Sequence, residues 1–222
     1  MKRVPEPELM TERRQVEAYG NADFEEPHSN FINLLKKYCS ETADLRTVLD
    51  LGSGAGDIVL RFAKEYPNSF IDAVEGSSAM VNFADDLLNS YPLVRGRIKL
   101  INSLVQDFSS STDYELIMSN SLLHHMHYPS HLWDKIRELS HPGTHVFIMD
   151  LMRPASIKEA EEFVRIYAAQ EPEVLKRDFY NSLLAAYTID EVKVQIAEAR
   201  LCNLEERQVS DRHFIVFGHK PE

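Results

Sequence analysis

The sequence predicts an α/β fold with a doubly wound sheet whose strands are mostly parallel. Two observations support this prediction. Five short apolar runs have the composition of buried strands, and stretches with helical spacing of apolar residues separate them. Strands that alternate with helices are typical of βαβ units in a parallel sheet. The length of 222 residues suits one hydrophobic core, so we expect a single domain.

Two helical segments precede the predicted sheet. The first, 11–19, has a weak apolar pattern, and the second, 28–39, places Phe31, Leu34 and Leu35 on one apolar face. The predicted strands are 47–51, 69–75, 97–102, 114–119 and 145–150. The helices expected between these strands cover 57–66, 78–90 and about 129–140.

A helical insert follows the fifth predicted strand. Ser156 and Glu159 have the spacing of a capping box at the start of a helix, and Thr188 and Glu191 repeat that spacing at the start of another. The last run, 204–220, reads as two strands joined by a short polar turn. This pattern indicates a closing β-hairpin with antiparallel pairing.

The segment TVLDLGSGAGD, residues 47–57, joins the first strand to its helix. Its glycines, Gly52, Gly54 and Gly56, run as G-x-G-x-G, and Asp57 stands where a dinucleotide fingerprint has its third glycine. A carboxylate there would face a pyrophosphate. No Lys-Ser or Lys-Thr pair follows, as a P-loop requires. The pattern therefore disfavours a dinucleotide and excludes a P-loop.

Carboxylates surround this glycine loop. Asp50 and Asp57 give it a negative potential, while the glycines let a ligand approach the backbone closely. Glu75 ends the next strand, in position to accept hydrogen bonds from two ribose hydroxyls. An adenine nucleoside without phosphates that carries an ammonium and a sulfonium fits this arrangement. S-adenosylmethionine is such a ligand.

Three segments, VLDLGSGAGD, AVEGSSAM and LIMSNSLLHHMHYP, resemble the first, second and fourth motifs of class I S-adenosylmethionine-dependent methyltransferases. The resemblance covers about 45–154, and the terminal hairpin is similar to the antiparallel seventh strand of that family. It implies a Rossmann-like, seven-stranded sheet with an antiparallel last strand. We therefore expect one methyltransferase domain, 1–222, with an N-terminal helical lid (1–44), a cofactor-binding core (45–154), a helical insert and helix (155–200) and a C-terminal β-hairpin (201–222).

The resemblance distributes the contacts of S-adenosylmethionine over several places. The glycine loop should surround the methionine part, Glu75 the ribose, the start of the next helix the ribose and adenine, and the turn after the third strand the adenine. The end of the fourth strand should lie beside the methyl group, and the N-terminal segment should fold over the cofactor. The expected cofactor-binding residues are Tyr19, Asp50, Gly52, Ser53, Gly54, Gly56, Asp57, Glu75, Gly76, Ser77, Met80, Ser103, Leu104, Asn120 and Ser121.

Alternatives for the loop stay open at this point. It can be a plain strand-to-helix turn or the site of a nicotinamide or flavin. Asp57 is also a good residue for a helix N-terminus, where a carboxylate stabilises the helix dipole without touching any ligand.

Methyl transfer from a sulfonium is an in-line displacement in which positioning supplies much of the rate. A hydroxyl, acidic carbon or protonated amine must also lose a proton, and histidine is suited to take it near neutral pH. His124 and His125 follow the fourth strand and are the candidate catalytic residues, as a base or as substrate-binding groups, with a structural role as the alternative. Together with His127 they lack the spacing of a zinc-protease motif, so we expect no metal.

Four further residues are expected at the acceptor. Asp150 and Arg153 end the fifth strand at the ligand-binding edge, and Arg153 suits an anionic group. Tyr180 and Asn181 belong to the insert that should close over this edge. The alternative is that the aromatic residues of the insert, such as Phe179, pack it onto the sheet.

Composition limits the partners and the location. The formal net charge of −11 disfavours a nucleic-acid substrate. No apolar run is long enough to span a bilayer, and the N-terminus lacks the apolar core of a signal peptide, so we expect a cytoplasmic protein, monomeric or homodimeric. The expected acceptor is a small molecule. The alternatives are a methyltransferase that acts on a protein or tRNA, and a binding protein that has lost turnover.

Overall fold

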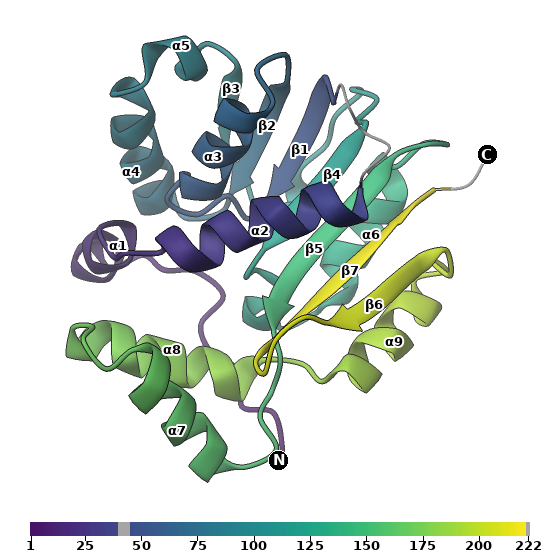
Figure 1. Ribbon diagram of the computed structural model, residues 1–222. Coiled ribbons are helices and arrows are strands. Elements are labelled where there is room, and N and C mark those ends of the chain that lie inside the picture. Colours follow the sequence, from purple (N-terminus) through teal and green to yellow (C-terminus); the bar gives the residue numbers. More distant parts are fainter. Residues whose placement is uncertain (40–44, 221–222) are drawn as a thin grey trace.

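The computed structural model describes residues 1–39 and 45–220, and in them seven strands form one sheet in the order β3-β2-β1-β4-β5-β7-β6 (Figure 1). Strands β1 to β5 pair in parallel, while β7 pairs antiparallel with both β5 and β6. The predicted fold class is confirmed. The strands are β1 (Thr47–Leu51), β2 (Phe70–Glu75), β3 (Ile98–Asn102), β4 (Leu116–Asn120), β5 (His145–Leu151), β6 (Leu204–Gln208) and β7 (His213–His219).

Helices cover both faces of this sheet, which is why consecutive residues of β4 and β5 are buried. On one face α2 and α3 bury Phe31 and Phe62, and on the other α6 and α9 bury Trp133 and Val192. The helices are α1 (Arg13–Gly20), α2 (Glu25–Tyr38), α3 (Asp57–Glu65), α4 (Ser78–Asn89), α5 (Pro92–Arg95), α6 (Ser130–Leu139), α7 (Ile157–Tyr167), α8 (Glu173–Ala185) and α9 (Ile189–Glu198), with short 3₁₀ turns η1 (Val105–Asp107) and η2 (Leu123–His125).

The carboxyl ends of the parallel strands point towards α1 and α8 (Figure 1). Helices α7 and α8 pack on each other through Phe163 and Leu183, against Leu151 at the end of β5. The helical insert therefore stands over the ligand-binding edge of the sheet. None of the described helices combines the length and the apolar character that a bilayer span needs.

The start of α2 and the beginning of the predicted lid differ from the prediction. Helix α2 begins at Glu25 rather than at 28, because Pro27 falls in the first turn, where a helix needs no backbone N–H donor, and two glutamates there stabilise the helix dipole. The first residues of the predicted helical lid are not helical. Residues 1–12, which we call the N-terminal strap, are extended until α1 begins at Arg13.

The strap is held along its length by the rest of the protein. Val4 donates its backbone N–H to the carbonyl of Leu184 at 2.9 Å, and Ser77 donates its hydroxyl to the carbonyl of Met10 at 2.5 Å. Arg3 donates to the carbonyls of Ala185, His124 and Met126. The strap thus joins α8, the η2 turn and the start of α4 across the ligand-binding edge.

One predicted capping box is complete. Thr188 accepts from the backbone N–H of Glu191 at 3.2 Å, and the Glu191 carboxylate accepts from the backbone N–H of Thr188 at 2.8 Å. At the other predicted box, Ser156 accepts from the N–H of Glu159, but the Glu159 carboxylate accepts from Ala155. The spacing therefore predicted both helix starts correctly. Of the two predicted capping boxes, the one at Thr188 has both hydrogen bonds, and the one at Ser156 has one.

Candidate active site

The glycine loop between β1 and α3 depends on left-handed backbone conformations. Gly52, Gly54 and Gly56 have φ angles of 77°, 53° and 86°. A Cβ atom on Gly52 would lie 2.8 Å from the Leu122 side chain, and one on Gly56 would lie 3.0 Å from the Cβ atom of Ala84. At Gly54 a Cβ atom would meet nothing within 4 Å. Gly52 and Gly56 thus allow neighbouring side chains to pack closely against the loop, whereas the space beside Gly54 is open.

Glu75, at the end of β2, ties this loop to the next helix. Its Oε2 accepts from the backbone N–H of Gly54 at 3.0 Å, and its Oε1 accepts from that of Ser77 at 2.7 Å. Burial raises the pKa of Glu75, although the backbone N–H groups act to lower it. Each carboxylate oxygen keeps a second lone pair for a ligand. The residue is therefore positioned to accept hydrogen bonds from hydroxyl groups.

Asp50, at the end of β1, is a buried carboxylate with one oxygen that lacks a hydrogen-bond partner in the described residues. Burial and the nearby charge of Glu75 raise the pKa of Asp50 to about 8. Its Oδ2 atom and the hydroxyl of Ser53 have no hydrogen-bond partner within the described chain. Native proteins satisfy nearly all such buried groups, so a missing ligand is the simplest partner. An ammonium group fits both oxygens, and these residues therefore fit S-adenosylmethionine.

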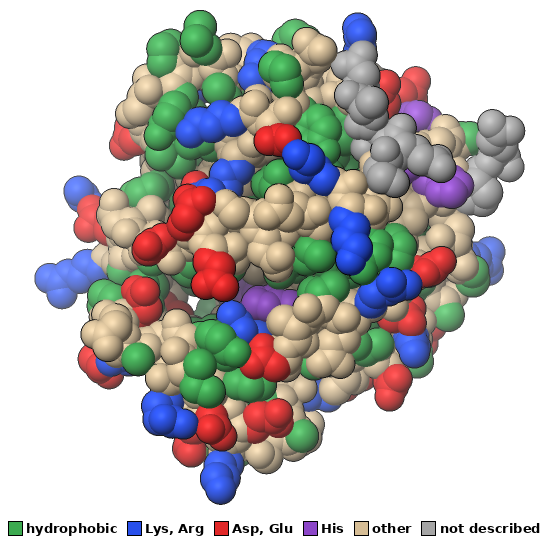
Figure 2. Space-filling view, in the orientation of Figure 1, with side chains coloured by type: hydrophobic (Ala, Val, Ile, Leu, Met, Phe, Trp, Pro, Cys, Tyr) green, Lys and Arg blue, Asp and Glu red, His purple; other side chains and the backbone are tan. Residues whose placement is uncertain are grey.

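A cavity of about 630 Å³ opens at the carboxyl edge of the sheet, between the N-terminal strap, the start of α2 and helix α8. A smaller cavity of about 160 Å³ adjoins it at the glycine loop. In Figure 2 a hollow separates the upper part of the molecule from the α7–α8 pair, with acidic side chains around it. The predicted cofactor residues that line both cavities are Tyr19, Gly52, Gly54 and Asn120. The larger cavity is also lined by Glu75, Gly76, Met80, Leu104 and Ser121, and the smaller one by Asp50, Ser53, Gly56 and Asp57.

The two candidate catalytic histidines lie on the η2 turn, and both line the larger cavity. His124 is buried and donates its Nδ1–H to Oδ1 of Asp150 at 2.5 Å. The second oxygen of Asp150 accepts from the backbone N–H of Leu123 at 2.7 Å. Burial lowers the pKa of His124, but the charge and hydrogen bond of Asp150 outweigh it, and the net shift is upward. Asp150 thus fixes the imidazole ring of His124.

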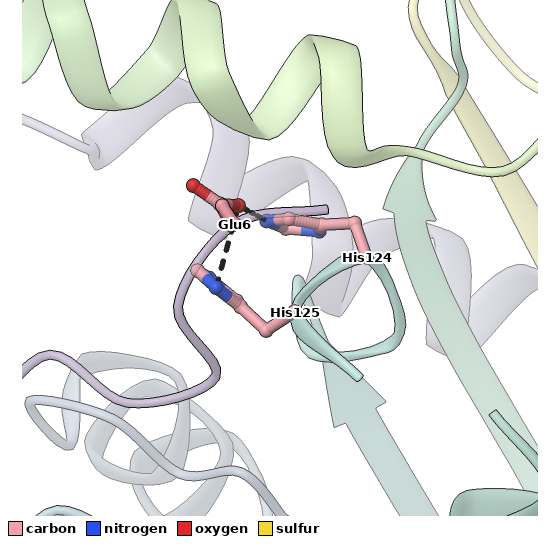
Figure 3. Close-up of side chains that lie close together, drawn as sticks. All are labelled: Glu6, His124 and His125. Atoms are coloured by element: carbon pink, nitrogen blue, oxygen red, sulfur yellow. Dashed lines mark ion pairs between the residues drawn. The ribbon is translucent and has the colours of Figure 1, made fainter. Parts of the chain in front are cut away.

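Glu6 of the N-terminal strap completes this group (Figure 3). Its Oε1 lies 3.7 Å from Nε2 of His124 and 3.3 Å from Nδ1 of His125. Burial raises the pKa of Glu6, although His124 and a hydrogen bond from Ser182 lower it. Burial and the neighbouring His124 lower the pKa of His125 to about 3, so its ring is neutral near pH 7. We call Glu6, His124 and His125 the Glu-His-His cluster.

A family model described as a methyltransferase domain matches residues 22–190. The chain belongs to this family. The match confirms the sequence-based identification of a class I methyltransferase and of S-adenosylmethionine as its cofactor.

The curated relatives that match parts of this chain include two further methyltransferases. The tRNA1(Val) (adenine(37)-N6)-methyltransferase of Pedobacter heparinus is 38% identical over 74 residues, which are 33% of this chain and 31% of the relative. A malonyl-(acyl-carrier protein) O-methyltransferase of Halalkalibacterium halodurans is 25% identical over 125 residues, 56% of this chain and 46% of the relative. The chain spans less than half the length of the curated relatives it matches.

The same fold occurs in solved structures. The plantazolicin methyltransferase BpumL, in complex with a monoazolic desmethylPZN analog and SAH, superposes with a TM-score of 0.70 at 13% identity, covering 93% of this chain and 90% of that chain. At such low identity the likeness concerns the fold. It agrees with the seven-stranded Rossmann-like sheet.

Asp57 takes part in a network that does not require a ligand. Its Oδ2 accepts from Nδ1 of His28 and from Nε of Arg61, each at 2.6 Å, and Arg61 also pairs with Glu25 at 2.8 Å. Burial raises the pKa of Asp57, but these hydrogen bonds outweigh it and the pKa is lowered. The network ties α2 to α3 beside the smaller cavity. Asp57 is also the first residue of α3, where the alternative role at a helix N-terminus places it.

Two predicted cofactor residues are absent from the described lining of both cavities. The Ser77 hydroxyl caps α4 by accepting from Met80, and Ser103 donates its hydroxyl to the carbonyl of Leu104 at 3.0 Å. Val105 and Gln106, which the sequence reasoning did not select, line the larger cavity instead. The sequence feature that could have identified them is their position directly after the turn that ends β3.

The predicted acceptor wall is arranged differently from the expectation. Asp150 stands behind His124, and Arg153 pairs with Glu191 at 2.7 Å, so its charge is used within the protein. Tyr180 packs in the α7–α8 core, and neither it nor Asn181 is among the described lining residues. The face of α8 that lines the cavity is formed by Leu175, Asp178, Phe179 and Ser182. Helix α8 thus presents a face that the sequence did not identify.

Neither Glu6 nor the acidic residues that line the cavity were predicted from the sequence. Glu6 lies in an extended segment more than a hundred residues before the histidines, and nothing in its local pattern marks it. Among the described residues that line the cavity, Arg212 is the only lysine or arginine. The carboxylates of the lining, besides Glu75, are Glu8, Asp23, Glu25, Glu26, Glu171 and Asp178.

Proposed function

We propose that this methyltransferase transfers the methyl group of S-adenosylmethionine to a small-molecule acceptor held in the larger cavity. The observation that carries the proposal is that one cavity of about 630 Å³ is lined both by the Gly52–Gly54 loop and Glu75 and by His124 and His125. Its volume is within the range of small-ligand sites. The cofactor and the acceptor can therefore meet without crossing solvent.

S-adenosylmethionine supplies a methyl group on a positively charged sulfur, which an aligned nucleophile displaces in line. We assign the ribose hydroxyls to Glu75, which keeps free lone pairs. The ammonium group is assigned to Oδ2 of Asp50 and the hydroxyl of Ser53, which have no hydrogen-bond partner in the described chain. Asn120 and Ser121 are assigned to the surroundings of the methyl group. Ser121 has a left-handed φ of 56°, a strained conformation that concentrates at functional sites.

The histidine turn is assigned to the acceptor. Because Asp150 holds the Nδ1–H of His124, the lone pair of the neutral ring is on Nε2, on the side of Glu6. That lone pair suits an acceptor group that must lose a proton, such as a hydroxyl or an ammonium. His125 and Glu6 offer further polar contacts to the same acceptor group.

The charge of the cavity mouth favours a neutral or positively charged acceptor. Carboxylates from α2, α8 and the strap surround the opening, and Arg212 is the single guanidinium in its described lining. A negative rim repels polyanions and attracts cations. The relative from Pedobacter heparinus is named for tRNA, but the rim and the net charge of −11 count against a nucleic acid here.

The test begins with calorimetric titration of the protein with S-adenosylmethionine, S-adenosylhomocysteine and, as a control, NAD. Incorporation of a labelled methyl group is then screened over amines, phenols and carboxylic acids, with tRNA and acyl-carrier protein as macromolecular comparisons. Binding of the first two ligands and labelling of a small amine or phenol is expected. A folded protein that binds neither ligand contradicts the proposal, labelling of tRNA or acyl-carrier protein alone contradicts the acceptor class, and binding without any labelling indicates a non-catalytic protein.

A further inference from the structure

We propose that the Glu-His-His cluster binds a divalent first-row transition-metal ion of the zinc class, at a site that faces the acceptor cavity. Glu6 would contribute Oε1, His124 would contribute Nε2 and His125 would contribute Nδ1 (Figure 3). The sequence pattern predicted no metal, because the carboxylate comes from a distant segment and the histidines are adjacent. The inference rests on the following geometry of the three side chains.

The distances suit a small cation. All three ligand atoms lie within 4.8 Å of one another, with Glu6 Oε1 3.3 Å from His125 Nδ1 and 3.7 Å from His124 Nε2. In a tetrahedral zinc site with bonds of about 2.0–2.1 Å, neighbouring ligand atoms are about 3.3–3.4 Å apart. The cluster is therefore close to the spacing of a metal site, and small rotations of the side chains would complete it.

Two of these atoms are otherwise unexplained. Oε1 of Glu6 and Nδ1 of His125 are buried, and neither has a hydrogen-bond partner in the residues that the structure describes. The side chains of Glu6, His124 and His125 are 10%, 3% and 17% exposed. A buried carboxylate oxygen without a partner is costly, and a cation at this point would satisfy it together with the imidazole nitrogen.

The surroundings orient the ligands as in known metal sites. Asp150 accepts the Nδ1–H of His124, which leaves Nε2 as the coordinating atom, and the ring of His125 is hydrogen-bonded to the backbone of Pro7. Ser182 hydrogen-bonds to the Glu6 side chain. Metal-binding histidines usually have such a carboxylate or backbone partner on the other ring nitrogen.

The charges and the ligand types narrow the class of ion. Glu6, Asp150 and the nearby Asp178 are acidic, and the neighbouring guanidinium of Arg3 donates to backbone carbonyls of the turn. Two imidazoles with one carboxylate suit zinc, iron, cobalt or nickel, whereas magnesium and calcium require oxygen ligands. Three protein ligands leave a coordination position for another molecule.

That position would take an oxygen or nitrogen of the acceptor, since His124 and His125 line the cavity. This part of the inference rests on the proposed function, whereas metal binding itself does not. A metal at Nε2 of His124 would use the lone pair assigned above to proton acceptance. The metal would instead lower the pKa of the bound acceptor group, which could then release its proton to water without His124 as the base.

The experiment is calorimetric titration of the untagged, chelator-treated full chain with Zn²⁺, together with visible spectroscopy after addition of Co²⁺. We expect saturable binding of one ion per chain and a Co²⁺ spectrum of low coordination number. Glu6→Gln and His125→Ala should abolish this binding, and Asp150→Asn should weaken it by about 10–100-fold. The matched controls are Glu12→Gln on the same strap and His131→Ala beyond the turn, which should bind Zn²⁺ as the unchanged protein does.

Absence of saturable binding to the unchanged protein overturns the inference, and so does binding that Glu6→Gln and His125→Ala both retain. Thermal unfolding of each variant establishes that it is folded, and Glu6→Gln keeps the size of the side chain if a histidine variant does not fold. Glu75→Ala separates the two proposals, because it should lose S-adenosylmethionine binding and keep Zn²⁺ binding. Failure of the proposed function and failure of the metal site therefore give different results.

Discussion

The two halves of the active site are built in different ways. The cofactor half is made by the ends of β1 and β2, where the backbone N–H of Gly54 in the glycine loop donates a hydrogen bond to the Glu75 carboxylate. The acceptor half brings together the strap, the η2 turn, the end of β5 and helix α8. Local motifs therefore define the first half, and long-range packing assembles the second.

The largest expected effect tests the cofactor half alone. Glu75→Ala should weaken S-adenosylmethionine binding by about 100-fold or more, because hydrogen bonds to a charged group contribute about 1.5–3 kcal/mol each. Titration calorimetry measures this change, with the exposed Glu161→Ala as the control. If Glu75→Ala binds the cofactor as tightly as the control, the local motifs do not form the cofactor site.

The next prediction tests the acceptor half. Asp150→Asn should lower the rate of methyl transfer by about 100-fold, because His124 loses the carboxylate that orients it. The affinity for S-adenosylmethionine should stay within about twofold, since Asp150 contacts the histidine turn and not the glycine loop. Separate measurement of kcat, KM and cofactor affinity checks this. An equal loss of cofactor affinity would mean that the two halves are not independent.

A third prediction concerns the protonation of Asp50. Its pKa is raised to about 8 by burial and by Glu75, so the folded protein binds more protons than the unfolded chain between about pH 4 and 8. The contribution of Asp50 to stability therefore falls as the pH rises through this window. A cationic ligand favours the charged carboxylate, and cofactor binding near pH 6.5 should release a proton. Calorimetry in buffers of different ionisation enthalpy measures the release, which Asp50→Asn should lack.

The smallest expected effect separates backbone strain from close packing at Gly56 of the glycine loop, with Gly143, outside the loop, for comparison. Gly56 and Gly143 have φ angles of 86° and 89°, but only at Gly56 would a Cβ atom have a close neighbour, Ala84. Gly143→Ala should cost about 1–2 kcal/mol for the left-handed conformation. Gly56→Ala should cost about 1 kcal/mol more for overpacking. Denaturant unfolding measures both, and equal losses would show that the contact with Ala84 relaxes freely.

Most of the fold could be predicted because its signals are local. Apolar runs marked the strands, and the spacing of Thr188 and Glu191 marked a helix start that the structure confirms. The start of α2 was missed because Pro27 reads as a turn residue, although the first turn of a helix accepts it. The extended strap has no periodic pattern, and its conformation depends on partners such as Leu184.

By itself the sequence determined the fold class, the glycine loop, Glu75 and the histidine turn, because residues adjacent in the chain or at matching strand ends create them. Only the tertiary structure decided that Glu6 lies beside His124 and His125, and that α8 presents Phe179 rather than Tyr180 to the cavity. The physical reason is that motif geometry follows from backbone conformation over a few residues. The acceptor half follows from how buried apolar faces orient whole elements, which no short stretch of sequence records.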